Sequence, residues 1–208
     1  MTGHEQHTWF REKGVWIDGK EIAWYDMEET TSTMDSADRM CEDEYRPWTV
    51  ISAETQISGR GTKGRNWYSP RGKGFWISII LPFPERAEYM EDISILAAQA
   101  LIESLEDLTG LRCTMKHPND VLFNGRKIAG ILCESRTSGE TVNSVILGMG
   151  INFLQACEDF EQAGLNEATS LFIETGRIPE RDALLRSFLG YFKPRYEKSV
   201  LKAHTVQP

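Results

Sequence analysis

Runs of apolar residues divide the first part of the chain into strands. In residues 15–25, VWIDGKEIAWY, apolar positions flank the turn dipeptide Asp18-Gly19, which predicts a β-hairpin. The segments TVISAET (49–55) and FWISIILPF (75–83) are typical of buried strands, and a proline ends the second. We expect each of these segments to be a strand.

Helical spacing of apolar residues appears in three other segments. TSTMDSADRMCED predicts a helix whose N-cap is Ser32 or Thr33, because a hydroxyl there accepts from free backbone N–H groups. ISILAAQALIESLEDLTG predicts a second helix that ends at Gly110. In the last third, a short helix should end near Gly176, and a longer one should begin after Pro179. The apolar stripe of this last helix consists of Leu184, Leu185, Phe188, Leu189 and Phe192.

Between residues 112 and 152 the pattern predicts a meander of strands. We expect four strands here: RCTMK, VLF, KIAGILCES and NSVILGMGIN. Turns are expected at HPND and at Asn124-Gly125. Together with the helices, this order predicts an α/β (α+β) fold in which a mixed β-sheet packs against helices.

Composition narrows the class of protein. The chain has 208 residues, of which 40% are hydrophobic and 26% charged, so a single globular domain is expected. The net charge of −8 argues against nonspecific nucleic-acid binding. The N-terminal residues lack the apolar core of a signal peptide, and no apolar run approaches the roughly 20 residues of a membrane span. We therefore expect a cytoplasmic protein without membrane contact.

The cysteines indicate no metal or disulfide framework. They are widely spaced, form no C-x-x-C pair and have no histidine cluster beside them. We expect them to be reduced and mostly buried: Cys41, Cys113, Cys133 and Cys157.

Residues 56–74, QISGRGTKGRNWYSPRGKG, have no apolar periodicity and are expected to form a loop. Five glycines allow backbone N–H groups to approach a ligand, and Arg60, Lys63 and Arg65 offer positive charge to a phosphate or carboxylate. The loop matches neither the P-loop pattern nor G-x-G-x-x-G before a helix. From composition alone, a solvated flexible loop remains the alternative to an anion-binding site.

Five strings, taken in order, resemble the catalytic domain of the biotin protein ligases within the biotin/lipoate ligase family. They are TSTMDSA, AETQISGRGTKGRNWYSP, KHPNDVLFNGRKIAGILCE, GMGIN and ATSL. The resemblance covers roughly residues 25–195 and implies a class II synthetase-like α/β domain. It also implies that biotin and ATP form biotinyl-5′-AMP and pyrophosphate, and that a lysine of a biotin carboxyl carrier domain of a carboxylase then accepts biotin. ATP is expected to arrive with Mg²⁺, whose ligands the sequence does not reveal.

The resemblance assigns roles to individual residues. The positions matching the biotin site are Ser32, Thr33, Gln56, Gly59, Arg60, Gly130, Gly148 and Gly150. The positions matching the ATP or adenylate site are Gly61, Thr62, Lys63, Arg65, Trp67 and Asn152. Ser32 and Thr33 could instead serve only as helix caps.

Lys116 and Arg60 are the expected catalytic residues. Lys116 matches the lysine that stabilises charge between the biotin carboxylate and the α-phosphate, and Arg60 is the cation expected nearest both groups. A strand lysine is ordinarily a solvated edge charge, but its position before Pro118 favours the catalytic role. Asn119 and Asp120 are interpreted mainly as turn residues that fix this lysine, and a further role in supporting the site is left open.

The sequence departs from the family pattern at two positions and at its ends. Thr62 replaces an arginine of the usual GRGR, and His117 replaces the tryptophan of the usual KWPND, which leaves acyl specificity open. Residues 1–24 are expected to be an extension with the hairpin, 25–200 the catalytic domain and 201–208 a tail. We expect neither a C-terminal β-barrel domain nor an N-terminal DNA-binding domain, and hence no DNA binding. The sequence leaves a homodimer open.

Two other functions fit the same fold. A lipoate- or octanoate-type acyl transferase would accept a flexible acyl chain, although GRGTKGRNW favours biotin. A noncatalytic biotin-binding module is the other alternative, suggested by Thr62 and the short C-terminus.

Overall fold

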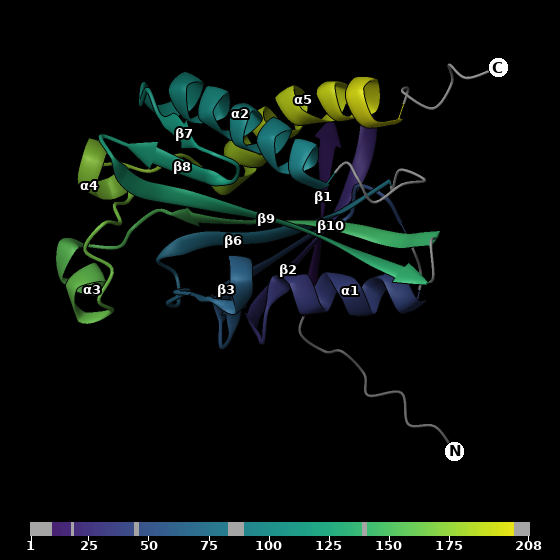
Figure 1. Cartoon of the computed structure of the whole chain (residues 1–208), viewed down its shortest axis with the longest axis horizontal. Helices are drawn as coiled ribbons and strands as arrows, with labels where there is room; N and C mark the ends of the chain where they lie inside the picture. Colours follow the sequence, from purple (N-terminus) through teal and green to yellow (C-terminus); the bar gives the residue numbers. More distant parts are fainter. Residues whose placement is uncertain (1–9, 18, 44–45, 83–89, 139–140, 202–208) are drawn as a thin grey trace.

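The computed structural model describes residues 10–17, 19–43, 46–82, 90–138 and 141–201. In this part of the chain an eight-stranded mixed sheet has helices on both faces, as Figure 1 shows. The expected fold class is therefore confirmed. No helix of the described residues is long and apolar enough to cross a membrane.

All neighbouring strands but one pair are antiparallel. From edge to edge the order is β1 (Phe10–Ile17), β2 (Lys20–Thr30), β3 (Val50–Gln56), β6 (Gly74–Leu81), β10 (Thr141–Asn152), β9 (Arg126–Ser138), β8 (Asp120–Phe123) and β7 (Thr114–Lys116). The parallel pair is β2 and β3, which are joined through helix α1 (Thr33–Asp43). A parallel connection needs such a crossover because the chain must return to the same end of the sheet.

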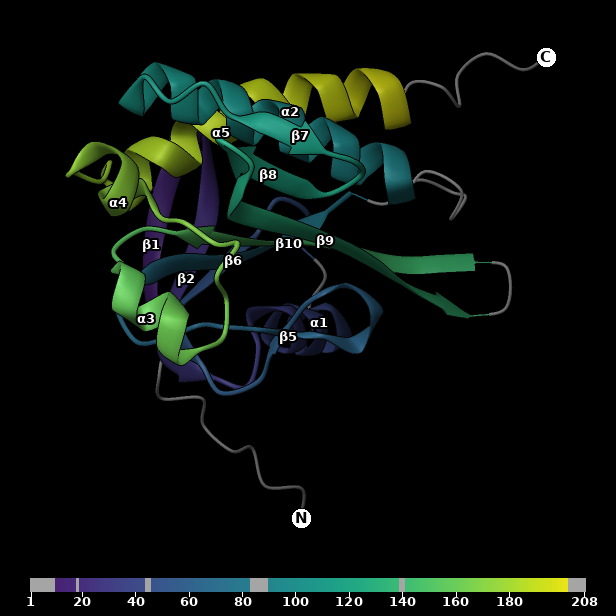
Figure 2. The same ribbon diagram turned by 60° about the vertical axis from the view of Figure 1, so that its left-hand side comes forward.

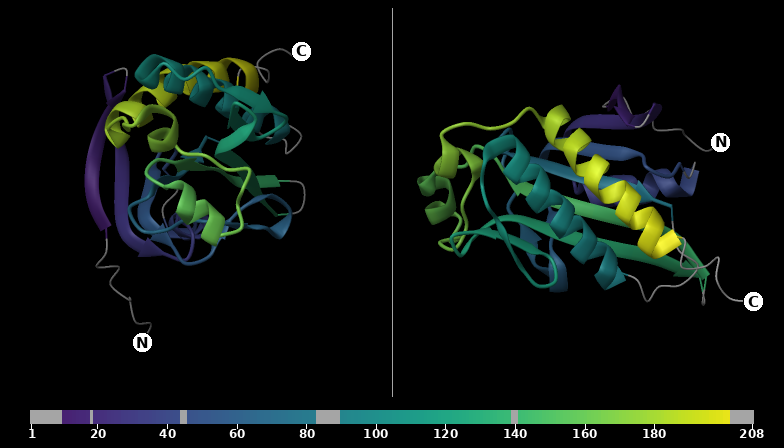
Figure 3. Two further views of the ribbon diagram at one scale, coloured as in Figure 1. Left: turned by 90° about the vertical axis from the view of Figure 1, so that its left-hand side faces the viewer. Right: turned by 90° about the horizontal axis from the view of Figure 1, so that it is seen from above.

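The predicted hairpin forms from β1 and β2, with Gly19 at φ +74° in the turn. Its strands form one edge of the main sheet (Figure 3, left), so residues 10–24 are continuous with the domain. The boundary expected at residue 25 falls inside β2. Residues 1–9 and 202–208, to which the rest of the expected extension and most of the expected tail belong, lie outside the described residues.

One face of the sheet is covered by helices α2 (Met90–Thr109) and α5 (Arg181–Tyr196), which lie side by side across it (Figure 3, right). Side chains of a strand alternate between faces, so odd-numbered residues of β6 and β10, such as Ile77 and Leu147, enter this core. The predicted stripe of α5 is buried against it. This layer provides most of the apolar burial.

Helix α1 covers only part of the opposite face. Met34 and Ala37 of α1 pack on Ile51, Ile80 and Ile146, which point away from the larger core. Farther along the same face, the sheet presents glycines instead of large side chains. The uncovered part of this face forms the cavity described below.

Two short helices lie at one end of the sheet (Figure 2): α3 (Cys157–Gln162) and α4 (Leu171–Thr175). The end of α4 at Gly176, φ +70°, confirms the predicted stop. The pattern did not predict α3, because six residues with one buried apolar side chain, Phe160, show no helical period. Helix α5 continues into a π-helical turn, η3 (Glu197–Leu201).

Residues 56–74 are not wholly irregular, which corrects the expectation of a loop. They contain a small hairpin of β4 (Gly59–Arg60) and β5 (Asn66–Trp67), connected through the 3₁₀ turn η1 (Thr62–Gly64). Two-residue strands are too short to show a period of two, so the sequence pattern could not reveal them.

The expectation for the cysteines is correct in part. All four are free thiols, but only Cys113 is buried, and Cys157 is exposed. Burial raises the pKa of the Cys113 thiol to about 11.

Candidate active site

A cavity of about 600 Å³ opens on the face of the sheet that carries α1. Its lining includes every residue of the predicted site except Gly59 and Lys63. Side chains and backbone from the start of α1, the β4–β5 hairpin and strands β7 to β10 therefore meet around one space.

Glycines form the floor of this cavity. Gly130 of β9 and Gly150 of β10 are direct partners across the sheet, and the indole of Trp67 lies over both. A Cβ atom would come within 2.6 Å of this ring at Gly130 and 2.2 Å at Gly150. At Gly148 it would lie 2.6 Å from the sulfur of Met34. Only glycine permits these side chains to approach the sheet so closely.

The start of α1 supplies neutral polar groups. Ser32 caps the helix, since its Oγ accepts a 3.2 Å hydrogen bond from the backbone N–H of Met34, as predicted. The Thr33 backbone N–H and hydroxyl both donate to Oε1 of Gln56, at 2.8 and 3.1 Å. Thr33 and Gln56 therefore hold each other in place, while Ser32 is held by the first turn of α1.

This polar group continues as a chain of hydrogen bonds. Buried Ser78 donates to the Thr33 hydroxyl at 2.8 Å, and Nε2 of Gln56 donates to Oγ of Ser69 at 2.7 Å. Ser69 in turn donates to the carbonyl of Trp67 at 3.0 Å. The chain joins the sheet, α1 and the hairpin, so these neutral donors and acceptors are fixed before any ligand enters.

The hairpin brings cations to the cavity. Arg65 donates to the Thr62 hydroxyl at 2.9 Å and to the Thr62 carbonyl at 3.2 Å. Thr62, which stands where the family pattern has a second arginine, therefore accepts two hydrogen bonds from Arg65. Lys63 has left-handed backbone, φ +58°, and is absent from the cavity lining.

Gly59 also lies outside the lining but has a structural role. A Cβ there would come within 2.7 Å of Ser69 Oγ and 2.8 Å of Gln56 Nε2. Its small size therefore allows the hairpin to pack on the polar chain, and no direct contact with the cavity is needed for this effect.

Lys116 ends β7 at the cavity and is exposed. The turn after it is tied to β9, because the side chain of Asn119 donates to the carbonyl of Ile131 at 2.9 Å. Asp120, however, does not serve only the turn: its carboxylate makes a 2.5 Å ion pair with Lys127.

Lys127 is a site residue that the sequence interpretation missed. Its ammonium lies 5.0 Å from the centroid of the Trp67 ring and is less exposed than that of Lys116, with 29% of the side chain accessible. Its place could not be found from the sequence, because it depends on contacts with Asp120 and Trp67 that form only in the folded chain. Two lysines therefore face the cavity, on either side of Asp120.

Asn152 is buried and already bonded to protein. Its amide donates to the Thr169 carbonyl at 2.9 Å, and its oxygen accepts from Gln155 at 3.0 Å. This arrangement ties the end of β10 to the segment before α4. Only part of the side chain's hydrogen-bonding capacity remains for a ligand.

The cavity therefore has neutral polar groups at α1, a glycine floor beneath an indole, and cations on the hairpin and on β7 and β9. This arrangement suits an elongated ligand with a neutral polar head and an anionic end. The fold and site define an α/β domain with a cationic, glycine-rich hairpin beside a cavity.

The chain belongs to the biotin/lipoate A/B protein ligase family, whose model matches residues 26–152. It is 33% identical over 178 residues to the bifunctional ligase/repressor BirA of Bacillus subtilis, covering 86% of this chain and 54% of that protein. It is 36% identical over 138 residues to a biotin--[acetyl-CoA-carboxylase] ligase of Paracoccus denitrificans, covering 65% of this chain and 57% of that protein.

Among solved structures, the biotin protein ligase of Aquifex aeolicus in complex with biotin and ATP matches with a TM-score of 0.71 and 28% identity. The match covers 86% of this chain and 74% of that one. The chain spans about half the length of the curated relatives named here.

Proposed function

We propose that this chain is an ATP-dependent biotin protein ligase. The strongest support is that side chains far apart in sequence line one cavity in the order that biotin and adenylate require: neutral at α1, cationic at the hairpin. The biotin--[acetyl-CoA-carboxylase] ligase of Paracoccus denitrificans matches 65% of this chain and the biotin protein ligase of Aquifex aeolicus matches 86%, which gives independent support.

In this proposal the two ends of the cavity bind different parts of the ligand. The ureido ring of biotin lies against Ser32, Thr33 and Gln56. Thr33 and Gln56 are oriented by their mutual hydrogen bonds, and Ser32 by its bond from the Met34 N–H. The carboxylate points toward Arg60. The α-phosphate and adenosine lie under the hairpin, near Arg65 and Trp67.

Adenylation forms a bond between a biotin carboxylate oxygen and the α-phosphorus and releases pyrophosphate. Negative charge on the phosphoryl oxygens and the leaving group must be stabilised in this step. Lys116 is our proposed cation from the sequence, and Lys127, held by Asp120 beside Trp67, is a second candidate. In the second step an acceptor lysine amine attacks the acyl carbonyl, and AMP leaves.

We expect Mg²⁺ to arrive with ATP. Among the described residues, no group of three or more His, Cys, Asp or Glu side chains could hold a metal ion. The site is compatible with an ion held chiefly by phosphate oxygens and water, as Mg²⁺ often is.

The proposed protein partner is a biotin carboxyl carrier domain of a carboxylase. We expect the reaction in the cytoplasm, where ATP is available, and we propose no DNA partner. The net charge of −8 argues against nonspecific nucleic-acid binding. A homodimer is compatible with this function and is tested by mass measurement in solution.

The direct test is pyrophosphate release from MgATP with biotin, and separately with lipoate or octanoate. Release with biotin alone, with biotinyl-AMP detected by mass spectrometry, supports the proposal. Release only with lipoate or octanoate would favour an acyl transferase, and binding of biotin without release would favour a noncatalytic module.

Replacing the lysine that stabilises the transition state by alanine should lower the rate of adenylation by about 10²-fold or more. The affinity for biotin should change little. We expect this of Lys116→Ala, and comparison with Lys127→Ala decides between the two cations. Lys193→Ala, on α5 at the other face, is the matched control. Near-normal pyrophosphate release in Lys116→Ala would contradict its role.

A further inference from the structure

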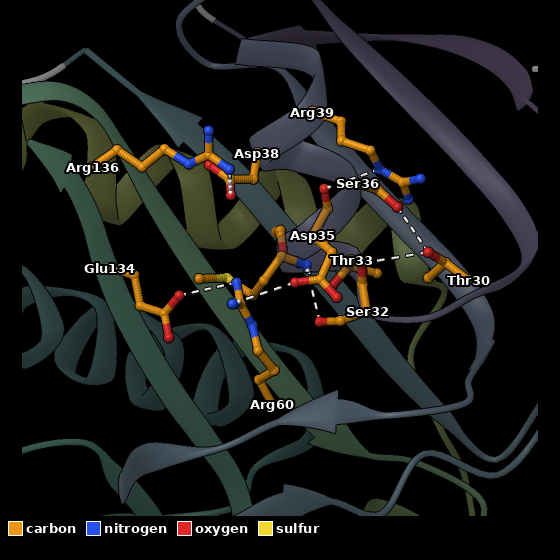
Figure 4. Close-up of polar contacts among 12 residues, drawn as sticks. Thr30, Ser32, Thr33, Asp35, Ser36, Asp38, Arg39, Arg60, Glu134 and Arg136 are labelled. Atoms are coloured by element: carbon orange, nitrogen blue, oxygen red, sulfur yellow. Dashed lines mark hydrogen bonds and ion pairs between the residues drawn. The ribbon is translucent and has the colours of Figure 1, made fainter. Parts of the chain in front are cut away.

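Arg60, on the β4–β5 hairpin, lies between two carboxylates. Its Nη1 is 3.3 Å from Oδ1 of Asp35 and its Nη2 is 2.9 Å from Oε2 of Glu134, and Figure 4 shows the guanidinium between them. All three side chains are between 35% and 41% exposed, and Arg60 itself lines the cavity.

The two carboxylates come from two different elements. Asp35 is in the first turn of α1, two residues after Thr33, which is expected at the biotin ring. Glu134 lies on β9, and its side chain is on the same face of the sheet as Gly130 and Leu132, both of which line the cavity. Arg60 therefore links the hairpin to α1 and to β9 at once.

Restraint of Arg60 also restrains the rest of the hairpin, because its two strands are paired. Arg60 pairs with Asn66, and Gly59 pairs with Trp67, whose indole lies on the glycine floor. The hairpin is thus anchored at one point by ion pairs and at another by ring packing. A glycine-rich segment is costly to order, so two anchors lower the entropy that a ligand must otherwise overcome.

We propose that Asp35 and Glu134 are positioning residues that hold Arg60 ready for the anionic part of the ligand. The guanidinium has five N–H donors, and these contacts use one terminal nitrogen each, so N–H groups remain for the biotin carboxylate and α-phosphate. This inference rests on the proposed function in its choice of ligand. The anchoring of the hairpin itself does not depend on it.

The test uses the isosteric variants Asp35→Asn and Glu134→Gln, alone and together. Each should lower kcat/KM for adenylation by roughly 2- to 5-fold, as expected for a partly exposed ion pair, and the double variant by about 10-fold. In an Arg60→Ala background the same changes should have almost no further effect, because the carboxylates act through Arg60. Asp35→Glu should retain most of the activity.

A matched control lies on the same two elements. Arg136 of β9 pairs with Asp38 and Glu42 of α1, so Asp38→Asn and Glu42→Gln break an equivalent link without touching the hairpin. These variants should leave adenylation unchanged. Equal losses in the control pair, or losses that persist without Arg60, would overturn the proposal. Tighter ligand binding in Asp35→Asn or Glu134→Gln would also overturn it, because the carboxylates would then compete with the ligand for Arg60.

Hydrogen exchange of the ligand-free protein separates this inference from the proposed function. Amides of residues 59–67 should exchange several-fold faster in the Asp35→Asn/Glu134→Gln variant than in the Asp38→Asn/Glu42→Gln variant. If the wild-type chain makes no biotinyl-AMP, the proposed function is wrong, and the exchange result still decides whether the carboxylates anchor the hairpin. Equal exchange in both variants would show that they do not.

Discussion

At the scale of single residues, the site depends on its glycines as much as on its polar and charged side chains. Gly130, Gly148 and Gly150 leave a hollow in a sheet that is otherwise densely filled, and Trp67 and Met34 lie in it. Thr62 is small as well, but its hydroxyl and carbonyl hold Arg65.

Gly150→Ala should displace Trp67, because the new methyl group would lie 2.2 Å from the indole nitrogen. We expect a loss of adenylation of at least 10-fold with the fold retained, measured by pyrophosphate release and circular dichroism. Gly190→Ala is the control, since nothing lies within 4 Å of its Cβ position in α5. That change should be neutral or stabilise the helix by up to about 1 kcal/mol. A fully active Gly150→Ala enzyme would show that the Trp67 position is not needed.

Thr62→Arg should slow escape of biotinyl-adenylate by about 10-fold or more, because a charge-assisted hydrogen bond contributes roughly 1.5–3 kcal/mol. Thr62→Val retains the size but removes the hydroxyl that holds Arg65, so it should speed escape. Dissociation rates after rapid dilution measure both effects. Identical rates for Thr62→Arg and wild type would mean that Thr62 is a neutral variation.

At the scale of elements, short segments are held by polar contacts where apolar stripes are absent. Helix α3 has one buried side chain, and its start is fixed by Asp159, whose carboxylate accepts from the Ala156 N–H at 2.8 Å and pairs with Lys73 at 3.0 Å. The Ala156 N–H first, and Lys73 second, hold the pKa of Asp159 below its ordinary value.

Because the folded-state pKa of Asp159 is lowered, its contribution to stability is present above the unfolded-state pKa, near 4, and is lost as pH falls through the folded value. Asp159→Asn should therefore lower the free energy of unfolding by about 1 kcal/mol at pH 7. The difference from wild type should shrink as pH falls below about 4. Urea unfolding at several pH values measures this, with exposed Glu158→Gln as the control. A pH-independent difference would contradict the role of the charge.

At the scale of the whole molecule, the sheet separates stability from function. The face under α2 and α5 contains most of the buried apolar side chains, whereas the face under α1 contains the cavity. Substitutions on the two faces should therefore have different consequences.

Leu185→Ala, in the fully buried stripe of α5, should lower the free energy of unfolding by about 2–5 kcal/mol. The KM for biotin should stay unchanged under conditions where the variant is folded, because the cavity lies on the other face. Leu108→Ala, on the partly exposed surface of α2, should cost far less. A raised KM in Leu185→Ala would show that the two faces are coupled.

The sequence by itself determined the elements whose signal is local or repeated. Alternation and helical spacing predicted the strands of the meander, α2 and α5, because burial on one side of an element imposes a period on its own residues. The five ordered strings predicted the family, and all but two of the site residues assigned from them line the cavity. Pairs of glycine and turn residues marked the ends of helices and hairpins, since their backbone preference is a property of the residue itself.

Only the tertiary structure decided which side chains meet. It brought Lys127 to Asp120 and Trp67, laid Trp67 on Gly130 and Gly150, and placed Arg60 between Asp35 and Glu134. These contacts depend on strand register, on the crossover through α1 and on the fold of a hairpin too short to show a pattern. No local property of the sequence specifies them, because each joins residues that become neighbours only when the sheet has assembled.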